Sequence, residues 1–446
     1  MKKVTLSALA ALMVSGAAYA DTLTLYTDTK TGQVFTTPGE GRVEMGDFID
    51  AKTAYMENQA QDSAIAKKEA KAEKDGYVHV KSKASKLEFS GTHYLGYVYT
   101  DKAAATAQDT SKFETRRNYF QVKAYMFDNK KSYMRMTLDT FQNNSTDMYT
   151  GTGDLQAEKQ GANDIGSWEV RLKYAFLYLD NILPYTGVEF GQVHRPWIDY
   201  EEHQGWWYRS ISKVFLEAAE SSDLSNSADL GINFKTKTPY FTSEIGLFNG
   251  EGYHQEELGT GNSFEWRLTA SIMGNGDKKR KPLEDTYFDI SSFGQIQQES
   301  TKVGVRDSGV DDGYDYRVYG FHTVYNQPSF LLSAQYVKSK SDNDGSVSAS
   351  NVNYKEGEGY SLNGTFRFGS DYAWEVLGRY DRWDDYKGLS GLATANPKEK
   401  EYWIAGLGYQ YNKNVKFIAN VIDVDPNKAV TDDEETRGMF TAEVHW

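Results

Sequence analysis

From Lys86 to Trp446 the sequence keeps a period of two, in which apolar and polar residues alternate in one run after another. Typical runs are RNYFQVKAYMF, SWEVRLKYAFLYLD and FEWRLTASIM, and about sixteen of them can be counted. Their length is near the roughly ten residues that a tilted strand needs to cross a membrane. This pattern predicts an all-β fold and constrains the chain more than any other feature.

The connections between these runs alternate between short and long. Tight turns such as FDNKKS, LPYTG and GSDY alternate with polar connections such as 143–166, 194–227 and 384–400. Outer-membrane barrels have short periplasmic turns and long external loops, and bacterial single-chain barrels have an even number of strands. The number is even only if DTYFDISSFGQI is a strand. We therefore predict a transmembrane antiparallel β-barrel of about sixteen strands at residues 86–446, rather than a secreted β-sandwich.

The region before the barrel has a different composition. Residues 1–20, MKKVTLSALAALMVSGAAYA, combine a basic start, a short apolar core and an A-x-A ending, which predicts a cleaved signal peptide. Residues 21–85 predict a periplasmic segment, with a small hairpin around Thr31-Gly32 and then a helix at 47–74. The helix has a seven-residue spacing with few strong apolar positions, so a solvated linker is favoured over an oligomerising coil.

Composition excludes several classes of protein. The mean hydropathy of -0.65 is too polar for a bundle of membrane-spanning helices. The formal net charge of -14 argues against a nucleic-acid partner, which would require a basic face. Because the chain has no cysteine, an exported protein of this kind must be held by backbone hydrogen bonds and packing, which a closed barrel supplies.

The two alternating faces of the strands differ in chemistry. Phe120, Val122, Trp168, Tyr174 and Phe176 are on the parity that we expect to face lipid, and basic residues are on the other. A barrel of this size keeps an aqueous lumen, whereas an Arg or Lys facing lipid at mid-depth would cost roughly 2–4 kcal/mol. The predicted pore-lining residues are Arg117, Lys123, Arg135, Arg171, Lys173, Arg267, Arg367 and Arg379.

The connection at 194–227 is unusually aromatic, with Trp197, Trp206, Trp207, Tyr208 and Phe215. Such side chains would be costly on a loop left in water, so we predict that this loop folds into the pore and narrows it. Packing over the rim, or against a neighbouring protomer, is an alternative that would also bury them. The predicted constriction residues are the bases Arg195, Arg209 and Lys213 and the acids Asp199, Glu201 and Glu202.

Motifs of enzyme and cofactor chemistry are absent from the sequence. It contains no HExxH, GxSxG or Walker loop and no Cys/His cluster. His194 and His203 lie in the aromatic loop, where solvated or core histidines are favoured over a metal pair. We therefore expect no catalytic residues, no metal site and no cofactor.

Several segments resemble the phosphate-selective porin O and P family. The resemblance covers most of 87–446 and is strongest at Gly191-Gln192, Pro196-Trp197, Arg209-Ser210 and the segment GLFNG at 246–250. It implies a trimer of sixteen-stranded channels in the outer membrane, with the third loop folded inward. In that family phosphate selectivity rests on an arginine ladder and a lysine cluster. Acidic residues are mixed with the inward bases here, so we expect at most a weak preference for anions.

The working hypothesis is an outer-membrane porin for passive diffusion of small hydrophilic solutes and ions. The alternative is a surface barrel whose long loops serve adhesion or bind a partner. Expected partners are outer-membrane lipid, two further copies in a homotrimer, small hydrophilic or anionic solutes, and the barrel assembly machinery. The closing segment GMFTAEVHW predicts a last strand that pairs with the first strand, at 87–97, and so closes the barrel. We expect the barrel assembly machinery to recognise this strand.

Overall fold

The computed structural model describes residues 23–48, 83–103, 108–126, 129, 131–142, 168–253, 261–300, 314–342, 356–385, 398–426 and 434–446. The chain divides into two compact units, 1–81 and 82–446. The predicted signal peptide and nearly all of the predicted helix lie outside the described residues. Asp47 and Phe48, where that helix was expected to begin, belong to a strand instead.

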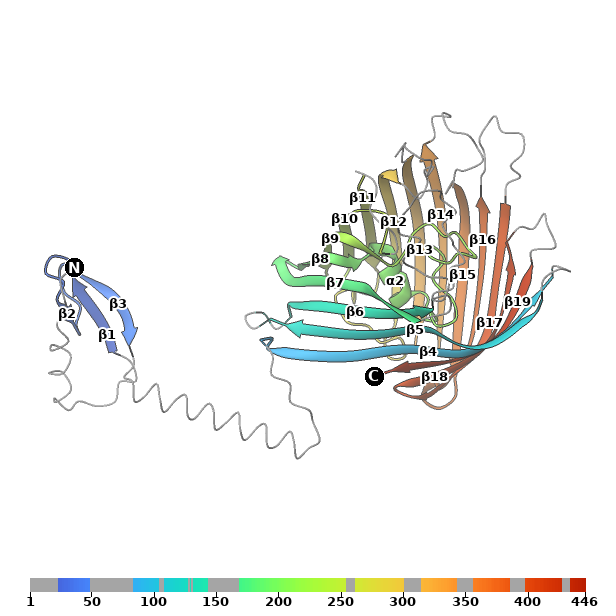
Figure 1. The fold of residues 1–446 in the computed structure, drawn as a ribbon, viewed down its shortest axis with the longest axis horizontal. Coiled ribbons are helices and arrows are strands. Elements are labelled where there is room, and N and C mark those ends of the chain that lie inside the picture. The colour runs from blue at the N-terminus through green and yellow to red at the C-terminus, as the bar shows by residue number, and fades with distance from the viewer. Residues whose placement is uncertain are drawn as a thin grey trace, which may run out of the picture. The chain divides into compact units, whose positions relative to one another are not determined.

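The second unit is a closed antiparallel barrel of sixteen strands, β4 to β19, in sequence order (Figure 1). This confirms the predicted barrel, including DTYFDISSFGQI, most of which forms β12 between its neighbours. The strands are β4 (Lys86–Lys102), β5 (Thr110–Tyr125), β6 (Tyr133–Gln142), β7 (Trp168–Leu183), β8 (Thr186–His194), β9 (Ala228–Lys237), β10 (Phe241–Phe248), β11 (Ser263–Ser271), β12 (Tyr287–Ser300), β13 (Tyr314–Gln327), β14 (Phe330–Asp342), β15 (Gly357–Phe368), β16 (Trp374–Asp385), β17 (Lys398–Asn412), β18 (Val415–Asp425) and β19 (Glu435–His445).

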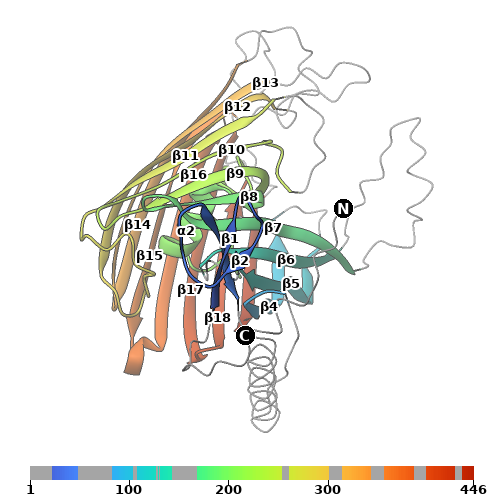
Figure 2. The ribbon, with the colours of Figure 1, turned by 90° about the vertical axis from the view of Figure 1, so that its left-hand side faces the viewer.

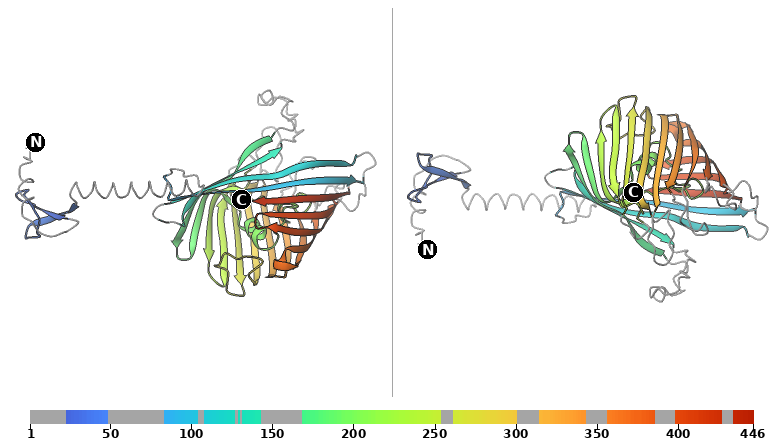
Figure 3. Two further views of the ribbon diagram at one scale, coloured as in Figure 1. Left: turned by 90° about the horizontal axis from the view of Figure 1, so that it is seen from below. Right: turned by 90° about the horizontal axis from the view of Figure 1, so that it is seen from above.

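The last strand closes the barrel by pairing with the first, as predicted. β19 and β4 are antiparallel partners, and Figure 3 shows the red C-terminal strand beside the light-blue first strand of the barrel. Trp446 extends this ladder, because its backbone N–H donates to Gly91 O at 3.1 Å and its carbonyl accepts from Gly91 N at 2.8 Å. Its indole N–H donates to His93 Nε2 at 3.0 Å. The closure leaves no open sheet edge at the seam.

The alternation of side chains follows the barrel wall. In β11, Glu265, Arg267 and Thr269 are buried inside, whereas Phe264 and Leu268 are exposed on the outer surface. This is the arrangement of a barrel with an apolar exterior and a polar interior.

Two β-bulges interrupt the alternation in the wall made by β4 to β7. The register leaves Arg116 opposite no residue of β4, since Tyr94 pairs with Arg117 and Leu95 pairs with Thr115. A bulge aims consecutive side chains at the same face. Arg116 accordingly reaches Ser210 O in the loop within the barrel, and Arg117 reaches Asp139.

The second bulge corrects part of the sequence-based assignment. Lys173 has no partner residue, because Thr137 pairs with Tyr174 and Leu138 with Leu172. Lys173, Tyr174 and Phe176 are all buried. The expectation that Tyr174 and Phe176 face lipid was therefore wrong, since strict alternation ends at Lys173.

The first unit contains a three-stranded sheet that we call the N-terminal sheet. It is formed by β1 (Leu23–Asp28), β2 (Val34–Phe35) and β3 (Arg42–Phe48) in the order β2-β1-β3. The predicted hairpin is present as β1 and β2, with Gly32 at a φ of 72° in its turn. The third strand was not predicted.

Candidate pore constriction

The connection between β8 and β9 lies inside the barrel. It begins with the helix α2 (Pro196–Gln204), which Figures 1 and 2 show enclosed by the strands. Trp197 stacks on Phe293 of β12, with ring centroids 3.7 Å apart and an angle of 5° between the planes. Trp206 and Phe215 are also buried. In the described part of the chain no helix is long and apolar enough to cross a membrane.

Polar contacts fasten this loop to several parts of the wall. Tyr200 Oη donates to Asp289 Oδ2 of β12 at 2.6 Å, and Tyr208 Oη donates to Thr365 Oγ1 of β15 at 3.1 Å. On β16, Arg379 Nη1 donates to Lys213 O at 2.6 Å. On the bulged side, Arg116 Nη1 donates to Ser210 O at 2.8 Å. The loop therefore bridges the lumen, and its position is held from several directions.

Cavities lie beside the loop, and two of them concern the predicted constriction. One, of about 390 Å³, is lined by Ser90, Thr92 and His445, which lie at the end of the barrel with the short turns. The other, of about 460 Å³, is lined by Lys112 and Arg437 near the ends with the long loops. Among the described residues, Arg209 is the one that lines both cavities. Arg209 therefore lies between the two cavities.

Arg209 is held by two carboxylates of the same loop. Its guanidinium contacts Glu202 and lies 2.7 Å from Glu217 Oε2, and Lys213 Nζ lies 3.5 Å from Glu217 Oε1. Burial raises the pKa of Glu217, but the nearby Arg209, Lys213 and Lys173 lower it more, so that this pKa falls well below its usual value. Glu217 is thus ionised at neutral pH and fixes the guanidinium in place.

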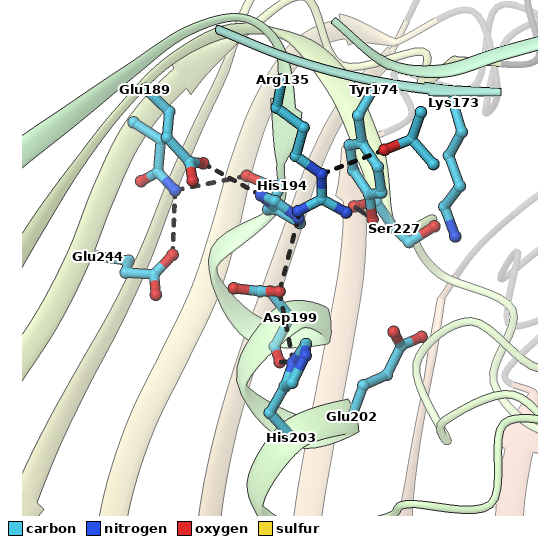
Figure 4. Close-up of polar contacts among 12 residues, drawn as sticks. Arg135, Lys173, Tyr174, Glu189, His194, Asp199, Glu202, His203, Ser227 and Glu244 are labelled. Atoms are coloured by element: carbon cyan, nitrogen blue, oxygen red, sulfur yellow. Dashed lines mark hydrogen bonds and ion pairs between the residues drawn. The ribbon is translucent and has the colours of Figure 1, made fainter. Parts of the chain in front are cut away.

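Tyr119 and Lys173 lie on the wall of the cavity at the end with the short turns. Lys173 Nζ donates to Tyr119 Oη at 3.0 Å. Figure 4 shows Lys173 and Glu202 pointing towards each other across this space. The part of the barrel wall that borders this cavity, on strands β5 to β7, thus presents polar and basic side chains to it.

A charged cluster holds the first turn of α2. Lys235 Nζ lies 3.1 Å from Glu189 Oε1, 3.3 Å from Asp199 Oδ2 and 3.3 Å from Glu244 Oε2. Asp199 also lies between His194 and His203, at 3.8 and 3.4 Å (Figure 4). Burial raises the pKa of Asp199, but the nearby His194 and Lys235 lower it by more. The pKa of Asp199 therefore falls well below its usual value, and the carboxylate is ionised. No group of three or more His, Cys, Asp or Glu in the described residues could hold a metal ion.

The predicted constriction residues fall into two groups. Arg209, Lys213, Asp199 and Glu202 line one or both cavities. The other two do not. Arg195 is buried against Glu265, with Nε donating to Oε1 at 2.8 Å, and Glu201 is buried and accepts a hydrogen bond from Gln335.

The predicted pore-lining residues divide in the same way. Arg117, Arg135 and Lys173 line the cavities, and Arg171 pairs with Asp139 at 2.9 Å beside them. Lys123 places its ammonium 4.9 Å from the Tyr133 ring centroid.

The remaining three are buried and support structure. Arg267 pairs with Glu244, Arg367 donates to the carbonyls of Gln327 and Pro328, and Arg379 pairs with Asp381. Sequence reasoning missed Arg116, Tyr119 and Arg437 as lining residues. The pair Arg116-Arg117 was a usable signal, because strict alternation would have left one of the two in lipid.

Comparison with known proteins identifies the fold. No protein-family model matches the chain, and no curated protein matches it. The anion-selective porin from Comamonas acidovorans is similar, with 12% identity, a TM-score of 0.55, and coverage of 81% of this chain and 99% of that chain. OmpF of Salmonella typhi, solved with daunomycin, has 15% identity, a TM-score of 0.51, and coverage of 83% and 100%.

OmpT, an outer-membrane protein of Vibrio cholerae in its trimer form, has 12% identity and a TM-score of 0.50, with coverage of 81% and 99%. At such low identity these similarities establish the fold alone. The chain has the sixteen-stranded barrel fold of outer-membrane porins, and the narrower resemblance to the phosphate-selective family stays a prediction.

Proposed function

We propose that this protein is an outer-membrane porin, through which small hydrophilic solutes and ions diffuse passively, and that it is not an enzyme. The observation that carries this proposal is the pair of cavities that share Arg209. An inward loop between two cavities is an arrangement that restricts solutes by size and charge. The barrel fold that the chain shares with porin structures supports the same reading.

We further propose a preference for anions. The cavity near the long loops is lined by Lys112, Arg116, Arg117, Arg209, Lys213 and Arg437, against the acids Glu114 and Glu220. The inward acids Glu244, Glu265 and Asp381 are buried and pair with buried arginines, so they do not face this cavity. The cavity wall carries more bases than acids, but Glu202 and Glu217 pair with Arg209, so the proposed preference is weak.

We also propose that the protein forms a homotrimer in outer-membrane lipid and is inserted by the barrel assembly machinery. The trimer form of the similar OmpT structure and the closing aromatic strand support this.

Planar-bilayer recording in a salt gradient tests the channel and its preference. The full chain should conduct, and its reversal potential should have the sign of an anion-selective pore. Lys281→Ala is a suitable control, because Lys281 is an exposed turn residue that pairs with Glu284 and lines neither cavity. A folded protein that conducts nothing would refute the channel, whereas a cation-selective potential would refute only the preference.

A further inference from the structure

The N-terminal sheet has two unlike faces. Partners in antiparallel strands share a face, and Thr27 pairs with Val34 on one side and with Val43 on the other. Val34 and Val43 are 48% and 54% exposed, and Met45, at an irregularity of the register, is 50% exposed. This face, which we call the valine face, is apolar, and no other described residue of the chain buries it.

The opposite face is covered from within the sheet. Tyr26 pairs there with Phe35 and Glu44, and the Arg42 guanidinium carbon lies 3.4 Å from the Phe35 ring centroid. Arg42 also donates to Thr37 O at 3.0 Å. Side chains of the sheet itself therefore pack on one face, whereas the valine face is free to contact another surface.

None of the described side chains of the N-terminal sheet is buried, so residues 23–48 have little core of their own. Domains shorter than about 40 residues are usually stabilised by disulfides, a metal or oligomerisation. The chain has no cysteine, and the described residues contain no group of acids and histidines that could hold a metal. Within residues 23–48, the sheet therefore has neither a disulfide nor a metal to support it, and packing against another surface is the remaining kind of support.

We propose that the valine face is an assembly surface, on which the N-terminal sheets of neighbouring copies of this chain pack against one another. The inference rests on the homotrimer of the proposed function. Residues 49–85 link the sheet to the barrel, and a fully flexible linker of this length has a root-mean-square end-to-end distance of about 35 Å. Three sheets tethered to one trimer would thus be at an effective concentration on the order of millimolar, which favours even weak apolar contacts.

Cysteine cross-linking of the full chain tests this surface without background, because the wild type contains no cysteine. Val43→Cys and Val34→Cys are each placed in the protein assembled in membranes, oxidised, and separated on denaturing gels. Both should give cross-linked dimers in high yield. Glu44→Cys is the matched control, since Glu44 is the next residue of β3, is exposed, and points to the opposite face.

Three outcomes would overturn the inference. Equal cross-linking of Glu44→Cys would indicate random collision. A Val43→Cys thiol that reacts with maleimide without cross-linking would show that the face is open to water. A thiol that does neither would show that other residues of the chain, or another protein, cover it. Bilayer conductance of the same samples separates this result from the porin proposal, because a conducting protein without cross-links would refute the assembly surface alone.

Discussion

Replacing Glu201 by Gln should stabilise the folded protein at alkaline pH. Glu201 lies on α2 within the barrel, is 1% exposed, and accepts a hydrogen bond from Gln335 Nε2. Burial raises its pKa to about 7, although Arg379 and Gln335 act in the opposite direction. Its second carboxylate oxygen, Oε2, makes no hydrogen bond of good geometry, although the Trp197 side chain also acts to lower this pKa. The folded protein must therefore accommodate a poorly solvated charge whenever Glu201 ionises.

The magnitude follows from the two pKa values. An acid whose pKa is higher in the folded state binds its proton more tightly there, so stability falls as the pH rises between the two values. The loss begins near the unfolded value of 4.5 and is complete above about 7. It amounts to about 3 kcal/mol at pH 8 and falls to about 0.2 kcal/mol at pH 4, where Glu201 is mostly protonated in both states.

Denaturant unfolding of the detergent-folded protein at pH 4, 6 and 8, followed by tryptophan fluorescence, measures this effect. Glu201→Gln should raise the free energy of unfolding by up to about 3 kcal/mol at pH 8 and hardly at all at pH 4. Glu202→Gln is the neighbouring control, and it should not stabilise, because Glu202 pairs with Arg209. A gain that is equal at all three pH values, or a loss at pH 8, would refute the assignment of a costly buried charge.

Further predictions concern the seam and the loop. Deleting Trp446 should impair assembly before it alters conductance, and normal insertion of the shortened chain would count against a role in closure. Gly91→Ala should reduce the folding yield, because its Cβ would lie 2.4 Å from the Trp446 ring, whereas Gly438→Ala, with open space around it, should not. Trp197→Ala removes the stack on Phe293 and should cost about 3–5 kcal/mol by thermal or denaturant unfolding, with a noisier and larger single-channel current. An unchanged stability and current would contradict the anchoring role of Trp197.

Much of the barrel could be predicted because its determinants are local and periodic. The alternation that places Glu265 inside and Phe264 outside is visible in any short window of β11. Bulges are different, since they depend on register with a neighbouring strand. The consecutive Arg116 and Arg117 carried a signal, because one of them would otherwise face lipid at a cost of roughly 2–4 kcal/mol. Lys173-Tyr174 carried none, since tyrosine is acceptable on either face.

The roles of the basic residues could not be separated from the sequence. Arg117 and Arg379 both point inward. The loop packs on β16, where Arg379 donates a hydrogen bond to Lys213 O, whereas Arg117 borders a cavity. Which wall the loop covers is a property of the whole fold. The third strand of the N-terminal sheet was missed for a simpler reason, because its last residues, Asp47 and Phe48, were assigned to a helix that began too early.

The central claim is that solutes pass between the two cavities at Arg209, and cysteine modification during recording tests it most directly. Arg209→Cys is reconstituted in a planar bilayer, and a charged methanethiosulfonate reagent is added to one side and then, in a second experiment, to the other. Because the chain has no other cysteine, any response reports this position. We predict a lasting fall in conductance with reagent from either side, and none for Lys281→Cys. Unchanged conductance, with modification at residue 209 confirmed by mass spectrometry, would contradict the claim that the pore passes this residue.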